Sequence, residues 1–177
     1  SALDTLANEA GVAIENARLY RATLEKAKIE HELRVAAEIQ RSLLPEGRRD
    51  GAYFHAMGAS LPSRSIGGDF FEYIDTDEGG IGVVVGDVAG KGPAAALLTA
   101  KIQGLFSAQV ASNSPATAMR LVNTGLLKRQ VDARYATVFF ATLSPDGALA
   151  YCNAGHNPPI VVSAAGVRPL MGSGMPV

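Results

Sequence analysis

The chain has 177 residues, of which 47% are hydrophobic and 19% are charged, and its formal net charge is −1. A chain of this length and composition can bury one sizeable globular core. Its charge gives no support for nucleic-acid binding, and no apolar run approaches the ~20 residues that span a bilayer. The single cysteine, Cys152, excludes an intrachain disulfide, and the N-terminus shows no signal-peptide pattern. We therefore expect a cytoplasmic protein with no nucleic-acid or membrane partner.

Residues 2–44 are expected to form one long helix, because they contain no proline and a single glycine, Gly11. At about 1.5 Å per residue, this helix would be roughly 65 Å long. Two apolar seams with coiled-coil spacing follow it, and they are out of phase near residues 27–29. The first seam contains Leu3, Leu6, Ala10, Ala13, Ala17, Tyr20, Leu24 and Ala27, and the second contains Ile29, Leu33, Ala36, Gln40 and Leu43.

A helix of this length needs a partner for its apolar stripe. Two interpretations stay open: the helix packs on its own domain, or it pairs with a second copy and forms a homodimer. Pro45 is expected to end the helix, and the polar residues 46–51 are expected to connect it to the next segment.

From Tyr53 onward, the pattern mixes strands with helices. Apolar and β-branched runs predict strands at 53–60, 69–75, 80–88, 135–144, 147–153 and 158–163. Helices are expected at 93–111 and 115–131, and the second has Ser114 as a candidate N-cap and Pro115 at its first position. Hairpins separated by two consecutive helices indicate an α+β layered fold.

Two aspartates are expected to face each other across the first hairpin. The turn-type cluster at 75–80 separates two apolar runs, so a hairpin centred near Glu78 pairs residues whose numbers add up to 156. Asp69 then lies opposite Asp87 on the same face, where like charges repel. Because carboxylates suit Mg²⁺ and Mn²⁺, this spacing predicts a metal site. A bulge in the turn would shift the register, and a capping role is the alternative for each aspartate.

The glycine-rich stretch 86–92 fails the P-loop pattern. Only three residues separate Gly86 from Gly90, and Gly92 replaces the required Ser or Thr. The glycines still leave backbone N–H groups at a helix start, where anions are favoured. Lys91 therefore either assists a phosphate or is a solvated surface lysine.

His156 lies in the turn-forming stretch 153–159, between two predicted strands. A general acid, a metal ligand and a structural turn residue are its three possible roles. The chain contains no Gly-x-Ser-x-Gly motif and no cysteine signature that would indicate a nucleophile.

Three motifs, in this order and spacing, resemble a known family: GGDFFEY at 67–73, GDVAGKG at 86–92 and NAGHNPP at 153–159. The family is the bacterial metal-dependent serine/threonine phosphatases of the protein phosphatase 2C superfamily, in the sporulation-phosphatase-E-like branch that regulates sigma-factor partner switching. AAEIQRSLLP at 36–45 is similar to the helix before the catalytic domain in this branch. Residues 6–20 resemble the last helix of a GAF sensor domain.

The resemblance implies an α-β-β-α sandwich with two Mn²⁺ or Mg²⁺ ions, which generate a hydroxide that attacks phosphoserine or phosphothreonine. It assigns Asp87 as the bridge between both ions, the Val88 carbonyl as a ligand of one ion, and Asp69 as a residue that binds the other directly or through water. It also implies a phosphorylated protein substrate similar to an anti-anti-sigma factor.

The chain departs from the family pattern in two respects. Two further metal-binding motifs, a Thr-Asp-Gly type and an Asp-Asp pair, do not occur in it, and Glu72 stands where Asp is commoner. We therefore expect a truncated chain: the last helix of a GAF-like domain at 1–20, a helical linker at 21–51 and the N-terminal part of a phosphatase domain at 52–177.

Three functions remain open from the sequence. The first is a phosphatase, with the truncated chain inactive alone. The second is a catalytically incompetent dimeric scaffold, which the missing acidic motifs favour. The third is a nucleotide-binding protein, against which the failed P-loop spacing argues.

Overall fold

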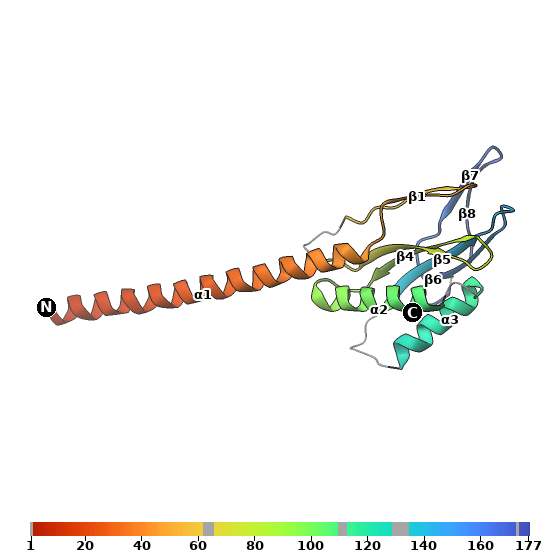
Figure 1. Ribbon diagram of the computed structural model, residues 1–177. Helices are drawn as coiled ribbons and strands as arrows, with labels where there is room; N and C mark the ends of the chain where they lie inside the picture. The colour runs from red at the N-terminus through yellow and green to blue at the C-terminus, as the bar shows by residue number, and fades with distance from the viewer. Residues whose placement is uncertain (1, 62–65, 110–112, 129–134, 173) are drawn as a thin grey trace.

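The computed structural model describes residues 2–61, 66–109, 113–128, 135–172 and 174–177 (Figure 1). Its elements are α1 (Ala2–Leu43), β1 (Arg48–Asp50), β2 (His55–Met57), β3 (Asp69–Asp75), β4 (Ile81–Val88), α2 (Pro93–Gln109), α3 (Pro115–Leu127), β5 (Ala136–Leu143), β6 (Leu149–Ala154), β7 (Ile160–Ser163) and β8 (Gly166–Pro169). This α+β arrangement agrees with the predicted fold class.

A four-stranded antiparallel sheet, in the order β3-β4-β5-β6, forms the centre of the domain. Helices α2 and α3 cover one face of this sheet (Figure 1). The hairpins β1–β2 and β7–β8 lie on the other face (Figure 1). The two faces therefore have different neighbours, and alternate residues of each strand serve one or the other.

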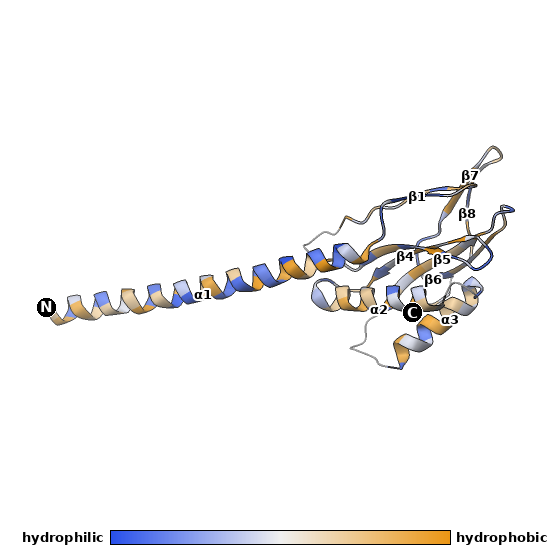
Figure 2. Ribbon diagram, in the orientation of Figure 1, coloured by the Kyte–Doolittle hydropathy of each residue, from blue (hydrophilic) through white to orange (hydrophobic). Residues whose placement is uncertain are grey.

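The main hydrophobic core lies between the sheet and the two helices, and Figure 2 shows hydrophobic residues along the ribbons of these elements. Phe106 of α2 packs against Phe140 of β5, with ring centroids 5.6 Å apart. Both side chains are fully buried, as are Ile102, Val84 and Val122. Burying a side chain of this size contributes about 1.5–3 kcal/mol, so this face anchors the sheet.

The opposite face of the sheet is only partly covered by the described residues. Phe71, Tyr73 and Ile81 form a small cluster there, and Phe54 packs against it. A hollow of about 200 Å³ remains on this face, lined by residues of β2, β4, β5 and β6 together with Phe54. Toward the end of the sheet that carries Asp87, Val85 is 38% exposed. This face is therefore more open near the two aspartates than near the hairpin turn.

The β3–β4 hairpin has the register that the turn sequence predicted. Asp69 pairs with Asp87 at one end and Asp75 pairs with Ile81 at the other. Gly79 adopts a φ of 73°, and its N–H donates to the Thr76 carbonyl. Because glycine adopts this left-handed conformation without strain, the turn closes without a bulge in the strands.

Helix α1 projects from the domain as a rod (Figure 1). Every residue from Ala2 to Glu32 is exposed, and hydrophobic residues alternate with polar ones along its length (Figure 2). Its C-terminal end is anchored, because Ala37 is buried and Gln103 donates to the Leu43 carbonyl over 3.3 Å. The described part of the chain contains no helix that is long and apolar enough to span a membrane.

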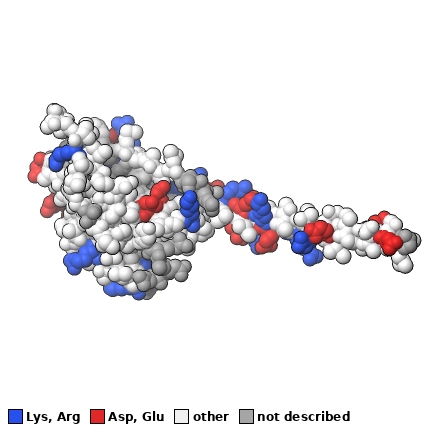
Figure 3. Space-filling view, turned by 180° about the vertical axis from the view of Figure 1, so that it is seen from behind, with Lys and Arg blue, Asp and Glu red and all other residues white. Residues whose placement is uncertain are grey.

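Charged side chains of both signs are mixed along α1 and over the domain face seen in Figure 3. Several form local ion pairs, such as Arg18 with Glu15 at 3.1 Å. Exposed pairs of this kind contribute little to stability.

The structure corrects some predicted boundaries. Residues 48–50 form β1 and pair with β2, although the sequence indicated only a connecting segment there. β2 spans only 55–57, and β8, which pairs with β7, was not predicted. The predicted ends of the two later helices, at 110–111 and 129–131, lie outside the described residues. Ser114 is confirmed as an N-cap, because its hydroxyl accepts from the Thr117 N–H.

Candidate metal centre

The two predicted site aspartates lie at the open end of the central sheet. Asp69 begins β3 and Asp87 lies near the end of β4, and they pair directly across the strands. Directly paired residues of an antiparallel sheet point to the same face, with Cβ atoms about 4.5–5.5 Å apart. Both residues are exposed. The predicted facing pair of carboxylates is therefore confirmed.

The electrostatics of Asp87 reflect this neighbour. Desolvation raises the pKa of its carboxyl group, and the negative charge of Asp69 raises the pKa further. A side-chain hydrogen bond between the two carboxyl groups, which needs a proton, acts in the same direction, whereas His156 lowers the pKa. The pair thus retains a proton more readily than an isolated aspartate, and a bound cation would remove this need.

A tight backbone contact positions the residue before Asp69. The Val88 N–H donates to the Gly68 carbonyl over 3.2 Å, and the buried Thr99 hydroxyl donates to the same oxygen over 3.1 Å. A Cβ atom at Gly68 would lie 2.4 Å from the Val88 carbonyl oxygen. Only glycine permits this approach, so the sequence keeps the Val88 backbone and the start of β3 together.

Helix α1 contacts Gly67, the residue that precedes Gly68, through one side chain. The Gln40 amide donates to the Gly67 carbonyl over 2.7 Å, and its oxygen accepts from the Gly67 N–H at 3.2 Å. Sequence reasoning placed Gln40 in the second helical seam and missed this contact. The available signal was a polar residue at a seam position, because a glutamine carboxamide adds no hydrophobic contact to an apolar seam.

Two more polar residues continue the row of aspartates. Thr137 on β5 pairs directly with Asp87. Its hydroxyl lies 3.0 Å from Nδ1 of His156, which follows β6. Asn153 holds the backbone of His156, donating to its carbonyl over 2.9 Å and accepting from its N–H at 2.8 Å. The structure thus brings His156 to the edge of the sheet that carries Asp69 and Asp87. Thr137 was missed because two helices separate β4 from β5.

Glu72 and Lys91 lie apart from this row. Glu72 is on the alternate face of β3, where it accepts from Gln103 at 3.4 Å, and burial raises the pKa of its carboxyl group. Lys91 is exposed in the turn before α2, between two glycines with positive φ.

The oxygen atoms at this edge of the sheet are of the kind that a hard divalent cation binds. The two facing carboxylates provide oxygen ligands of the type that Mg²⁺ and Mn²⁺ bind, and the absence of a side chain at Gly68 keeps the Val88 carbonyl approachable. Within the described ranges, no group of three or more His, Cys, Asp or Glu side chains gathers as a metal site. The residues therefore fit one side of a metal centre.

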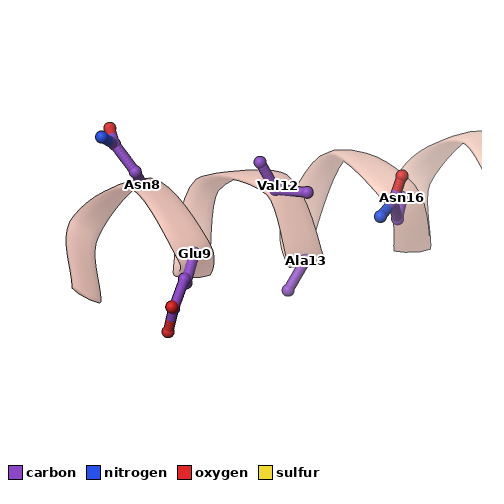
Figure 4. Close-up of a pocket in the computed structure, with 5 residues that line it drawn as sticks. All are labelled: Asn8, Glu9, Val12, Ala13 and Asn16. Carbon is purple, nitrogen blue, oxygen red and sulfur yellow. The ribbon is translucent and has the colours of Figure 1, made fainter. Parts of the chain in front are cut away.

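A separate surface hollow of about 350 Å³ lies on α1, lined by Asn8, Glu9, Val12, Ala13 and Asn16. Figure 4 shows that these side chains all belong to a single helix. A hollow formed by one helix encloses nothing and brings no catalytic groups together.

Comparison with known protein families gives a match to Stage II sporulation protein E (SpoIIE) over residues 77–177. The chain belongs to the SpoIIE family. The matched range includes Asp87, Thr137 and His156, whereas Asp69 lies before it. This membership agrees with the family resemblance of the sequence motifs.

Two curated relatives of this SpoIIE-family chain come from Bacillus subtilis (strain 168). Phosphoserine phosphatase RsbU is 28% identical over 134 residues, covering 74% of this chain and 39% of RsbU. Phosphoserine phosphatase RsbP is 27% identical over 157 residues, covering 82% of this chain and 38% of RsbP. The chain therefore spans less than half of the length of either relative.

A solved structure supports the fold. The SiaA-PP2C domain of Pseudomonas aeruginosa superposes with a TM-score of 0.64 at 21% identity, covering 85% of this chain and 63% of that one. The SpoIIE-family domain described here therefore has a fold of the protein phosphatase 2C type.

Proposed function

We propose that this chain is part of a metal-dependent protein phosphatase that hydrolyses phosphoserine or phosphothreonine. The observation that carries the proposal is the direct pairing of Asp69 with Asp87 beside the Gly68–Val88 contact. Membership of the SpoIIE family and two relatives named phosphoserine phosphatases support it.

In this proposal, Asp69, Asp87 and the Val88 carbonyl would hold the divalent cations, Mn²⁺ or Mg²⁺. Cations in such a site supply a hydroxide nucleophile and polarise the phosphoryl group. The chain's own contribution is positional. Gln40 and Thr99 hold the loop before Asp69, and the β3–β4 register sets the spacing of the two carboxylates.

We propose a phosphorylated protein similar to an anti-anti-sigma factor as the substrate, and the cytoplasm as the compartment. The resemblance of the three motifs to the partner-switching branch supports both. In the same proposal, residues 1–20 end a GAF-like sensor domain, 21–51 form the linker, and 52–177 begin the catalytic domain.

We also propose a homodimer formed through α1. Leu6, Tyr20 and Leu24 of the first seam are 61%, 66% and 53% exposed, and no other described element of this chain packs on them. The second seam differs, because its last turns contact α2 and the Gly67 loop. One interpretation left open by the sequence holds for the C-terminal end of the helix, which packs on its own domain, and the exposure of the rest supports the proposed homodimer.

The alternative function is a catalytically incompetent scaffold. The observation in its favour is that the described residues provide two facing carboxylates and no larger acidic group. Two carboxylates cannot hold two dications tightly. We therefore propose that the 177-residue chain has little turnover alone, and that residues beyond it complete the site.

The test compares the 177-residue chain with a protein extended to the length of the relatives. The extended protein should hydrolyse a phosphoserine peptide with Mn²⁺, and Asp87→Asn should abolish this activity. Asp77→Asn, in the exposed hairpin turn, is the matched control and should retain it. Robust turnover by the short chain, or an unchanged rate in Asp87→Asn, would contradict the proposed site.

A further inference from the structure

His156 is held in place more firmly than a solvent-exposed turn residue requires. Its backbone N–H and carbonyl are both bound by the side chain of Asn153, which is 5% exposed. Its ring is bound through Nδ1 to the Thr137 hydroxyl at 3.0 Å. Three hydrogen bonds thus fix both the backbone and the ring plane of one histidine.

The position of this ring follows from the sheet register. Asp69, Asp87 and Thr137 are direct neighbours on β3, β4 and β5. Their side chains share one face, so the Thr137 hydroxyl brings the imidazole alongside the two carboxylates.

The second ring nitrogen is available for a ligand. Nδ1 is occupied by Thr137, and among the described residues Nε2 has no hydrogen-bond partner. When the Thr137 hydroxyl donates to Nδ1, the ring proton lies on Nε2, which then acts as a donor. The residue is only partly buried, which leaves room for a ligand to reach the ring.

The geometry favours a role other than metal ligation for His156. Among the described residues, no group of three His, Cys, Asp or Glu side chains gathers closely enough to share an ion, and this holds for His156 with Asp69 and Asp87. A phosphoryl group is negatively charged, so it needs neutralising or hydrogen-bond-donating groups when it approaches two carboxylates. An N–H donor beside the Asp69–Asp87 pair meets that need.

We infer that His156 is a substrate-binding residue whose Nε2–H donates to a phosphoryl oxygen, with Thr137 and Asn153 as the positioning residues. This inference rests on the proposed phosphatase function and deepens it. The same donor would serve a phosphoprotein substrate and the inorganic phosphate product, because both present terminal phosphoryl oxygens.

The test uses the extended phosphatase at saturating Mn²⁺, with inorganic phosphate as inhibitor and a phosphoserine peptide as substrate. His156→Ala should raise both the inhibition constant of phosphate and the KM of the peptide about tenfold, the loss of one hydrogen bond to a charged group. His156→Gln, which keeps an N–H donor, and Thr137→Val should give smaller increases. His31→Ala, an exposed histidine on α1, is the control.

Calorimetric titration with Mn²⁺ separates the possible outcomes. The inference expects the Mn²⁺ affinity of His156→Ala to stay within about twofold of the unmodified protein. A parallel loss of Mn²⁺ affinity would make His156 a metal ligand and overturn the inference. An unchanged phosphate inhibition constant would overturn it as well, as would an increase confined to the peptide, which indicates a contact to the leaving group.

A second measurement does not depend on turnover or on the folding of a variant. In the extended phosphatase without substitutions and with Mg²⁺ present, inorganic phosphate should shift the Nε2 resonance of His156. This resonance is observed by NMR of ¹⁵N-labelled histidine. An unshifted resonance would overturn the inference. Failure of the proposed function shows separately, as an absence of metal-dependent turnover or as full activity in Asp87→Asn.

Discussion

Two carboxylates that face each other at the end of a sheet destabilise that sheet unless something neutralises them. Asp69 and Asp87 form such a facing pair, and Phe71 and Val85 are the next residues on the same face. An evenly apolar strand end would be the more stable choice. The acidic pair is therefore best understood as a binding feature retained at the cost of stability.

At this scale, Asp87→Asn should stabilise the metal-free protein. Because the pKa of Asp87 is raised above 3.8 in the folded state, the folded protein binds the proton more tightly than the unfolded chain. This contribution to stability is present at acidic pH and is lost as the pH rises through the raised pKa. At pH 7 the variant should gain up to about 1 kcal/mol, the repulsion of two unit charges about 4 Å apart in water.

Urea unfolding in EDTA at pH 3 and pH 7 measures this difference, with Asp77→Asn as the control. The gain should disappear at the lower pH. A variant that is less stable than the unmodified protein at pH 7 would contradict the repulsion argument.

Tyr73 offers a second prediction for a single residue. Its hydroxyl is buried and has no hydrogen-bond partner in the part of the chain that the structure describes, and burial raises its pKa. Leaving a buried donor unpaired costs about 1–3 kcal/mol. Tyr73→Phe should therefore leave stability unchanged or raise it by about 1 kcal/mol in thermal unfolding. A clear loss of stability would show that the hydroxyl has a partner after all.

At the scale of elements, the end of α1 is joined to the acidic pair by a short chain of contacts. Gln40 binds the Gly67 backbone, and the adjoining Gly68 contacts Val88. Gln40→Ala leaves a half-buried N–H and a carbonyl without their partner. We expect a loss of about 1–2 kcal/mol in unfolding free energy and a weaker Mn²⁺ affinity.

Glu38→Ala is the matched control, since Glu38 is exposed on the same turn of helix. Chemical unfolding and calorimetric Mn²⁺ titration of both variants check the prediction. Equal Mn²⁺ affinities in the two variants would show that the loop holds its position without Gln40.

Elements set by local sequence could be predicted, whereas those set by distant pairing could not. The β3–β4 register follows from the turn around Glu78, and the helix start at Pro115 follows from Ser114 and the proline itself. By contrast, β1 and β8 are strands of three and four residues with polar or exposed side chains. They form strands because they pair with β2 and β7, and their sequences show no alternation of hydrophobic and polar residues that would predict a strand.

The same distinction applies to the site. The Asp69–Asp87 pair lies within one hairpin, so its geometry was accessible from spacing. The place of Thr137 beside Asp87 depends on the β4–β5 pairing, which the chain reaches only after two helices. The contact between Gln40 and Gly67 joins residues 27 positions apart and depends on how the end of α1 packs against the domain.

At the scale of the whole molecule, the first apolar seam of α1 is not covered by any other described element of this chain. An exposed apolar seam of this length favours association with a second helix. The chain should therefore sediment as a dimer at tens of micromolar concentration. Leu6→Asp or Leu24→Asp should shift it toward monomer, because each places a charge in the seam.

Asn8→Asp, a charge of the same sign outside the seam, is the control and should leave the dimer intact. An unmodified chain that sediments as a monomer at these concentrations would count against the homodimer.

The central claim is that the Asp69–Asp87 edge binds a divalent cation, and paramagnetic NMR with Mn²⁺ tests it most directly. Substoichiometric Mn²⁺ should broaden the amide resonances of Asp69, Asp87 and Val88 first, and Asp87→Asn should remove this selectivity. The exposed acidic residues of the hairpin turn, Asp75, Asp77 and Glu78, provide an internal comparison at the other end of the same strands. Broadening that begins at this turn, or that is unchanged in Asp87→Asn, would contradict the metal centre.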